Sequence, residues 1–151
     1  AMWLPYSRVA ALVSAALITT GAAQNGGESS YDDYFAAYAH PDMHRQMLQD
    51  RPRTEAYAAA LGREPEVVRG KTVLDFGCGT GILSLLAARA GALRVICVEG
   101  SALADTTRQV VAKNGFSSTI SVMQTTHKEL QLPDKVDVIV SEWMGFFMVT
   151  E

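Results

Sequence analysis

The segment that most limits the possible folds is residues 73–81, with the sequence VLDFGCGTG. An apolar run contains the acidic residue Asp75, and three glycines with GxGxG spacing follow it before an Ala- and Leu-rich stretch. This order is typical of a buried strand, a tight turn and a helix. Because glycine has no Cβ, such a turn lets the backbone approach a ligand closely. A tight strand–helix connection without a ligand stays open as the alternative.

The sequence after this turn alternates between strand and helix patterns. Predicted strands cover residues 71–76, 93–98, 119–124 and 136–141, and predicted helices cover 82–90 and 102–113. Upstream, two short helices are expected to meet near Pro41, and a third is expected to begin at Pro52 and run to Leu61. Such alternation predicts an α/β fold with a doubly wound parallel sheet, right-handed crossovers, helices on both faces and strand order 3-2-1-4.

Composition narrows the function only modestly. The 151 residues have a formal net charge of −3, which argues against direct nucleic-acid binding through phosphate contacts. Cys78 and Cys97 lack metal-ligand spacing and the density of a disulfide scaffold, so we predict two reduced thiols and no metal. Residues 1–27 differ from the rest, since the apolar run VAALVSAALI is followed by TTGAAQ. A targeting segment, a core helix and an artefactual extension all remain open for this leader.

The glycine turn favours one type of cofactor. A dinucleotide fingerprint requires GxGxxG, but Ile82 stands where its third glycine would fall. The turn therefore favours a nucleoside cofactor without a pyrophosphate, above all S-adenosylmethionine. Glu99 ends the second strand about 20 residues later, where a carboxylate can accept both hydroxyls of a ribose. An acidic residue in a solvated loop is the alternative for Glu99.

The end of the chain, residues 141–151, reads SEWMGFFMVTE and carries two glutamates, Glu142 and Glu151. Two carboxylates over one pocket form a fork for a guanidinium group, because each can accept hydrogen bonds from its N–H donors. This pair therefore indicates arginine as the substrate.

These motifs occur together with Tyr34-Phe35, Tyr38, His44, Met47-Leu48, Asp50, Arg53-Thr54, Tyr57, VLDFGCGTGILS, AGA, VEGS and SEWMG. The combination closely resembles the protein arginine N-methyltransferases over residues 31–151. The resemblance is greatest to the type I members, which form asymmetric dimethylarginine, and among them to the nuclear, histone-modifying branch.

The resemblance implies a Rossmann-like methyltransferase domain and a role for each matching residue. It assigns the cofactor site to His44, Arg53, Asp75, Gly77, Gly79, Glu99, Lys128 and Glu129, the catalytic glutamates to Glu142 and Glu151, and the substrate pocket to Tyr34, Tyr38 and Met47. In that assignment Arg53 pairs with the methionine carboxylate of the cofactor. Residues 31–69 are expected to form helices that cap the cofactor site, and residues 70–151 the incomplete methyltransferase core.

The sequence also departs from the family pattern. Lys128 stands where the family usually has a glutamate that accepts a hydrogen bond from the adenine amino group. Lysine offers only donors, so Glu129 or the backbone must supply that acceptor. Phe146 replaces the tyrosine of the usual SEWMGY sequence.

Family members continue through further strands, a substrate-binding β-barrel, a Thr-His-Trp loop and a dimerisation arm. We therefore expect the fold to be truncated before these parts and the chain alone to be a marginally stable fragment with little turnover. For the full-length protein the resemblance implies a homodimer, arginine-containing substrates such as histones or RNA-binding proteins, and a cytoplasmic or nuclear location. A catalytically silent partner of another methyltransferase and a small-molecule or RNA methyltransferase stay open as alternatives.

Overall fold

The computed structural model describes residues 41–63 and 65–142. The predicted pocket residues Tyr34 and Tyr38, the catalytic candidate Glu151 and the leader all lie outside the described residues. The helices are α2 (Pro41–Gln49), α3 (Arg51–Arg63), α4 (Pro65–Val68), α5 (Ile82–Arg89) and α6 (Leu103–Lys113), and the strands are β1 (Thr72–Phe76), β2 (Arg94–Glu99), β3 (Ile120–Gln124) and β4 (Val138–Ser141).

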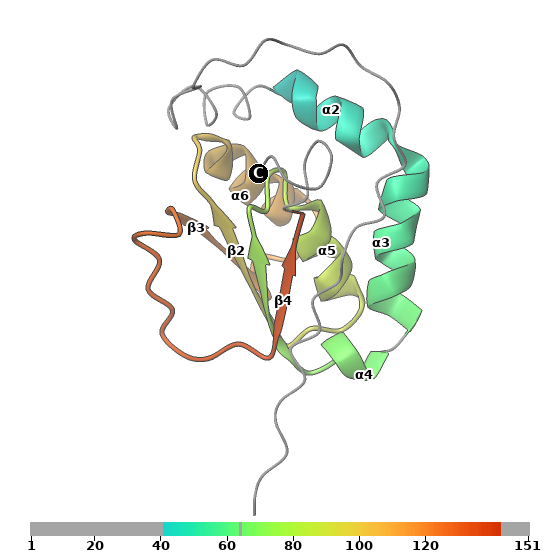
Figure 1. Cartoon of the computed structure of the whole chain (residues 1–151), viewed down its shortest axis with the longest axis vertical. Coiled ribbons are helices and arrows are strands. Elements are labelled where there is room, and N and C mark those ends of the chain that lie inside the picture. Colours follow the sequence, from blue (N-terminus) through green and yellow to red (C-terminus); the bar gives the residue numbers. More distant parts are fainter. Residues whose placement is uncertain (1–40, 64, 143–151) are drawn as a thin grey trace, which may run out of the picture.

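The four strands form one parallel sheet in the order β3-β2-β1-β4 (Figure 1). This confirms the predicted fold class and strand order. In the register of β1 with β2, Asp75 lies opposite Cys97 and Phe76 lies opposite Val98. The carboxyl ends of all four strands consequently meet along one edge of the sheet, which is where ligands bind in open α/β folds.

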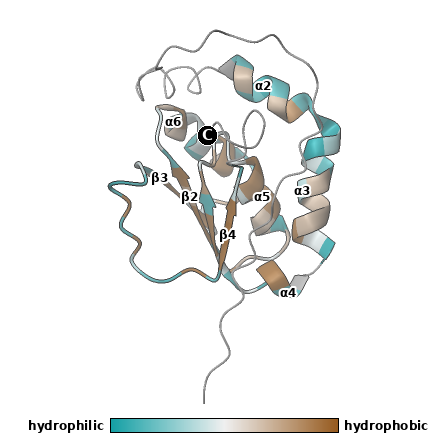
Figure 2. Cartoon of the chain, in the orientation of Figure 1, coloured by the Kyte–Doolittle hydropathy of each residue, from teal (hydrophilic) through white to brown (hydrophobic). Residues whose placement is uncertain are grey.

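The main hydrophobic core lies between the sheet and the helices α3, α5 and α6. Alternate strand residues such as Val73, Val95 and Val140 meet Leu83 and Leu61 from the helices in this core. Within the described residues, the strands are accordingly largely hydrophobic, whereas α2 and the beginning of α3 are more polar (Figure 2). Burial of each such side chain contributes roughly 1.5–3 kcal/mol to stability.

The opposite face of the sheet carries a second, smaller cluster. Leu74, Ile96 and Val98 are buried there, and Leu130, Leu132 and Val136 from the connection between β3 and β4 pack against them. The sequence predicted helices on both faces of the sheet, but within residues 41–63 and 65–142 the connection between β3 and β4, which contains no helix, covers this face.

Local signals explain where the helices begin. Asp50 accepts a hydrogen bond on Oδ1 from the backbone N–H of Arg53 at 3.1 Å, so it caps α3 at its N-terminus. Helix α3 extends beyond the predicted range at both ends, and the four-residue helix α4 was not predicted because it is too short to show a period. Within residues 41–63 and 65–142, no helix is long and apolar enough to cross a membrane.

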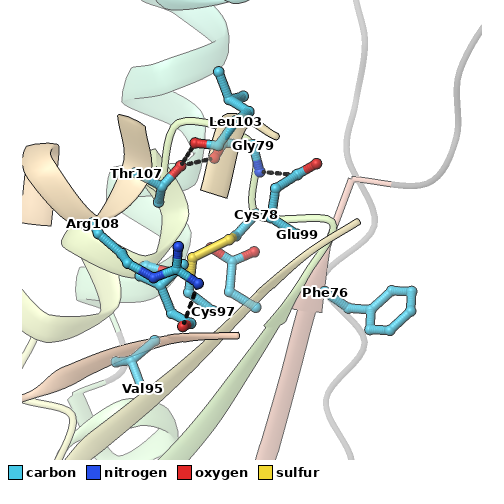
Figure 3. Close-up of a disulfide and its surroundings, with 12 residues drawn as sticks. Phe76, Cys78, Gly79, Val95, Cys97, Glu99, Leu103, Thr107 and Arg108 are labelled. Carbon is cyan, nitrogen blue, oxygen red and sulfur yellow. Dashed lines mark hydrogen bonds between the residues drawn. A yellow bond between two sulfur atoms is a disulfide. The ribbon is translucent and has the colours of Figure 1, made fainter. Parts of the chain in front are cut away.

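The cysteines correct one prediction. Cys78 and Cys97 are not reduced thiols but form a disulfide, with their Cα atoms 5.5 Å apart (Figure 3). The turn after β1 folds back over β2, because the N–H groups of both Gly77 and Cys78 donate to the carbonyl of Val98. This return brings Cys78 next to Cys97 although the two residues are 19 positions apart.

Candidate functional site

The glycine turn at the carboxyl end of β1 has a backbone that favours glycine. Gly77, Gly79 and Gly81 have φ angles of 72°, 52° and 83°, all in the left-handed region. The hydroxyl of Thr107 on α6 lies within hydrogen-bond distance of the Gly79 carbonyl and of the Leu103 carbonyl. Since a hydroxyl has one proton to donate, these two acceptors share it. Together with the hydrogen bonds from Gly77 and Cys78 to Val98, these contacts fix the turn to both β2 and α6.

Glu99 lies at the end of β2 and joins the turn to the next loop. Its Oε2 accepts a hydrogen bond from the N–H of Gly79 at 2.9 Å, and its Oε1 accepts one from the N–H of Ser101 at 2.8 Å. Only 8% of the residue is exposed, so it is not a solvated loop acid. A carboxylate can accept about four hydrogen bonds, so about two acceptor positions remain after these two contacts. Such a group fits a pair of ligand hydroxyls.

Helix α2 covers the same turn through His44. This side chain is buried, and a Cβ added to Gly79 would lie 2.9 Å from its Cε1 and 3.2 Å from its Nδ1. No real Cβ atom tolerates the shorter distance without a shift. The close approach of His44 and the φ angle of 52° therefore both favour glycine at position 79, and the contact brings two of the predicted cofactor-site residues together.

We expect the substitution Gly79→Ala to be strongly disruptive, because alanine would be strained at φ 52° and would collide with His44. The strain alone should lower the free energy of unfolding by about 1–3 kcal/mol, measured by urea denaturation. S-adenosylmethionine binding, measured by calorimetry, should weaken as His44 is displaced. Gly62→Ala is the control, since nothing lies within 4 Å of a Cβ at that position in α3. Equal effects of the two substitutions would contradict the role of close packing.

Asp75 lies beneath the turn and is completely buried. Its Oδ2 accepts a hydrogen bond of 2.7 Å from the hydroxyl of Ser84 in α5, while its Oδ1 is buried without a partner within the described residues. Burial raises the pKa of Asp75 to about 7, and the nearby charge of Glu99 adds to this rise, whereas the Ser84 hydrogen bonds oppose it. A carboxyl group in this position connects β1 to α5 and carries a proton over much of the acidic range.

Two residues that the sequence assigned to different ligands meet at the other side of the site. Nη2 of Arg53 in α3 forms an ion pair with Oε2 of Glu142, which follows β4. Their side chains are only 18% and 24% exposed, and the Arg53 guanidinium lies 5.7 Å from the centre of the Tyr57 ring. Ser141 supports this arrangement, because its hydroxyl donates to the carbonyl of Phe76 at 2.7 Å and fixes the end of β4.

The remaining candidates in the described residues are not among the residues of these contacts. Met47 is half-buried on α2, whereas Lys128 and Glu129 are exposed in the turn after β3. That turn begins where the N–H of Thr125 donates to the carbonyl of Glu99 at 3.1 Å. The loop carrying Lys128 and Glu129 is therefore attached to the end of β2.

The sequence did not predict the parts played by Thr107 and Ser101. Thr107 lies on the same helix face as Leu103 and Val111. A polar residue on such an apolar face is the signal that could have indicated its role. Ser101 accepts a hydrogen bond from the N–H of Leu103 at 3.1 Å, which is the typical role of serine at the start of a helix.

A parallel sheet with a GxGxG turn after β1 and a buried acidic residue at the end of β2 defines a Rossmann-like methyltransferase domain that depends on S-adenosylmethionine. The family model described as ribosomal protein L11 methyltransferase (PrmA) matches residues 54–145, more than half of the chain. The chain therefore belongs to the methyltransferases that this model describes, and it is also homologous to the protein arginine N-methyltransferases.

Three relatives support the narrower assignment. The chain is 47% identical over 124 residues to probable protein arginine N-methyltransferase 1.2 of Arabidopsis thaliana, covering 82% of this chain and 34% of that protein. The Trypanosoma brucei PRMT1 enzyme–prozyme heterotetrameric complex with AdoHcy contains a chain with a TM-score of 0.72 and 47% identity, covering 74% of this chain and 35% of that one.

Arabidopsis thaliana protein arginine methyltransferase 10, in an open conformation, gives a TM-score of 0.74 at 42% identity, covering 76% of this chain and 33% of its own. The chain therefore spans about a third of the length of the relatives that it matches.

Proposed function

We propose that this chain binds S-adenosylmethionine and takes part in methyl transfer to the guanidino nitrogen of arginine in protein substrates. The observation that carries the proposal is the arrangement at the carboxyl ends of β1, β2 and β4. Glu99 and the glycine turn lie together there, and Glu142 is held by Arg53. The relatives named above, which are protein arginine N-methyltransferases, support the same activity.

The donors and acceptors in the described residues fit this cofactor. Glu99 keeps about two free acceptor positions for the ribose hydroxyls, and Gly79 leaves room where a side chain would collide with His44. Arg53 has five N–H donors, so its guanidinium can hold the methionine carboxylate and Glu142 together. When bound, the cofactor supplies an electrophilic methyl group on its sulfonium.

The chemistry of the substrate explains why carboxylates are needed beside that methyl group. Arginine stays protonated in water, so one of its nitrogens must become nucleophilic while the group enters as a cation. Glu142, with Glu151 as its proposed second partner, would accept hydrogen bonds from the other nitrogens and draw positive charge toward them. Arg53 fixes Glu142 in a partly buried position. Glu142 can then orient the guanidinium of the substrate arginine, and no covalent intermediate is needed.

The substitution Arg53→Lys tests this role. Lysine keeps the charge but cannot fork onto two carboxylates, so we expect S-adenosylmethionine binding to weaken by about 10- to 100-fold in calorimetry. Arg51→Lys is the matched control, because Arg51 is exposed on the same helix, α3. If both variants bind the cofactor as tightly as the unaltered chain, Arg53 does not hold it.

The activity itself is tested with labelled S-adenosylmethionine and matched peptides that contain either arginine or lysine. Incorporation into the arginine peptide alone supports the proposal, whereas labelling of a nucleoside or RNA would replace it with another acceptor. Cofactor binding without any methyl transfer would support the cofactor-binding role and would show that the chain alone does not catalyse the transfer.

A catalytically silent partner is the second candidate function. The exposed Lys128 in the loop proposed to contact the adenine supports it, since lysine cannot accept the hydrogen bond that the family glutamate accepts. The Trypanosoma brucei relative forms a heterotetrameric complex of an enzyme with a prozyme, so a relative assembles with a second kind of subunit. The silent partner should bind a methyltransferase subunit in sedimentation experiments but retain no labelled cofactor.

The finer features of the function follow from the same resemblance. We propose a type I activity that forms asymmetric dimethylarginine, histones or RNA-binding proteins as substrates, a homodimer for the full-length protein, and a nuclear or cytoplasmic location. Mass spectrometry of a methylated peptide tests the first of these, because asymmetric and symmetric dimethylarginine fragment differently.

A further inference from the structure

The Cys78–Cys97 disulfide connects the two halves of the candidate cofactor site. Cys78 lies between Gly77 and Gly79 in the glycine turn, and Cys97 lies on β2, two positions before Glu99 (Figure 3). The bond therefore joins the neighbours of the two residues, Gly79 and Glu99, that share a hydrogen bond. No part of the proposed methyl transfer uses either sulfur.

We propose that Cys78 and Cys97 form a reversible redox modification site that controls S-adenosylmethionine binding. Its reactants are small thiols and their disulfides, of which reduced and oxidised glutathione are the representative pair. The inference rests on the proposed function, because cofactor binding at the glycine turn is what the site controls.

The difference in burial between the two cysteines determines where exchange begins. Both cysteines are buried, but Cys78 is 6% exposed and Cys97 is 0% exposed, so an incoming thiolate attacks the sulfur of Cys78, the more accessible residue of the two. The disulfide breaks, Cys97 leaves as a thiolate and takes a proton, and Cys78 is joined to the reagent. A second thiolate attacks the outer sulfur of that mixed disulfide, which releases Cys78 as a thiol and the reagent as its disulfide. The protein gains two electrons and two protons, and oxidised glutathione reverses both steps.

The glycines around Cys78 explain why this bond affects the ligand site. Gly77 and Gly79 flank Cys78 with positive φ angles, and glycine has more backbone freedom than any other residue. Besides the bond, the turn is held on β2 by the N–H groups of Gly77 and Cys78, both to Val98, and by the contact of Gly79 with Glu99. The disulfide removes turn conformations in which Gly79 leaves Glu99. Reduction restores them, and cofactor binding must then order the turn again.

The disulfide form is therefore the tighter binder. We expect reduction to weaken S-adenosylmethionine binding by about 5- to 10-fold, the cost of ordering roughly one residue. The bond also closes a loop of sequence separation 19, so reduction should lower the melting temperature by about 10 °C. A disulfide with a purely structural role would change the melting temperature. It would not change the affinity for S-adenosylmethionine measured well below that temperature.

The experiment uses the whole chain, equilibrated in defined mixtures of reduced and oxidised glutathione. Alkylation of free thiols and intact mass report the redox state, and calorimetry at 15 °C gives the S-adenosylmethionine affinity of each form. A single two-electron transition with weaker binding on the reduced side is the expected result. The double variant Cys78→Ala/Cys97→Val should bind like the reduced chain in every mixture.

Two results overturn the inference alone, and a third overturns it together with the proposed function. Two free thiols in every mixture would show that the bond does not form in solution. Equal affinity of the two forms would show that the bond does not control the site, while leaving the proposed function intact. If neither form binds S-adenosylmethionine, the proposed cofactor binding is wrong, and the redox control of that binding is wrong as well. The first two results leave the proposed cofactor binding untouched.

Discussion

The substitution Glu99→Ala should weaken S-adenosylmethionine binding by at least about 100-fold. Two hydrogen bonds from ligand hydroxyls to a charged carboxylate would be lost, each worth about 1.5–3 kcal/mol. The N–H groups of Gly79 and Ser101 would lose their acceptor as well, so the turn itself would be less ordered. Calorimetric titration of the variant with the cofactor measures the effect.

The control for this prediction is Glu66→Ala, since Glu66 is exposed on α4, at the other end of the sheet (Figure 1). A circular dichroism melt of each variant checks that it is folded at the temperature of titration. Glu99→Gln adds a graded test, because its side chain keeps one acceptor oxygen but places an N–H donor group against a backbone N–H. Its affinity should fall between those of Glu99→Ala and the unaltered chain. Cofactor binding by Glu99→Ala at the strength of Glu66→Ala would show that Glu99 does not hold the ligand.

The substitution Asp75→Asn should remove a large pH dependence of stability. The carboxyl has a pKa of 3.8 in the unfolded reference and about 7 when buried in the fold, so the folded chain binds the proton more tightly. Its favourable contribution is complete below pH 4 and is lost as the pH rises through about 7. The difference between these two pKa values corresponds to about 4 kcal/mol in the free energy of unfolding. Asparagine can keep the oxygen that accepts from Ser84 but carries no charge, so the variant should be more stable than the unaltered chain at pH 8.

Urea denaturation at pH 5 and pH 8 measures this difference. Each variant is compared with the unaltered chain at the same pH, so that other titrating groups cancel. Asp134→Asn is the control, since Asp134 is exposed in the loop before β4 and should leave the pH dependence unchanged. The same loss of stability between pH 5 and pH 8 in Asp75→Asn and the unaltered chain would contradict the buried proton.

The fold was predictable because its signals are local. The strand after Lys71, the glycine turn and the helix that follows are contiguous in the sequence, and the alternation of strands and helices restricts the topology to very few arrangements. The predicted boundaries of these elements lie within two residues of those of β1, β2, β3, β4, α3, α5 and α6. The second upstream helix, after Pro41, corresponds to α2.

The contacts that build the site were less predictable because they join distant positions. The ion pair between Arg53 and Glu142 spans 89 positions and depends on how α3 packs beside the end of β4. The disulfide depends on the register of β1 with β2 and on the return of the turn over Val98, neither of which a spacing of cysteines reveals. The ligand roles of the site residues stay predictions, including those of Tyr34, Tyr38 and Glu151 outside the described residues.

Glu99 has a consequence for how this protein can vary. Its side chain holds the loops that follow β1 and β2, and its own carbonyl accepts the N–H of Thr125 at the start of the loop that follows β3. Three connections at the ligand edge therefore share one residue as a common anchor. A loop from another methyltransferase could be grafted here only if it kept an N–H donor facing Glu99, so the three loops form a single unit for engineering and for divergence.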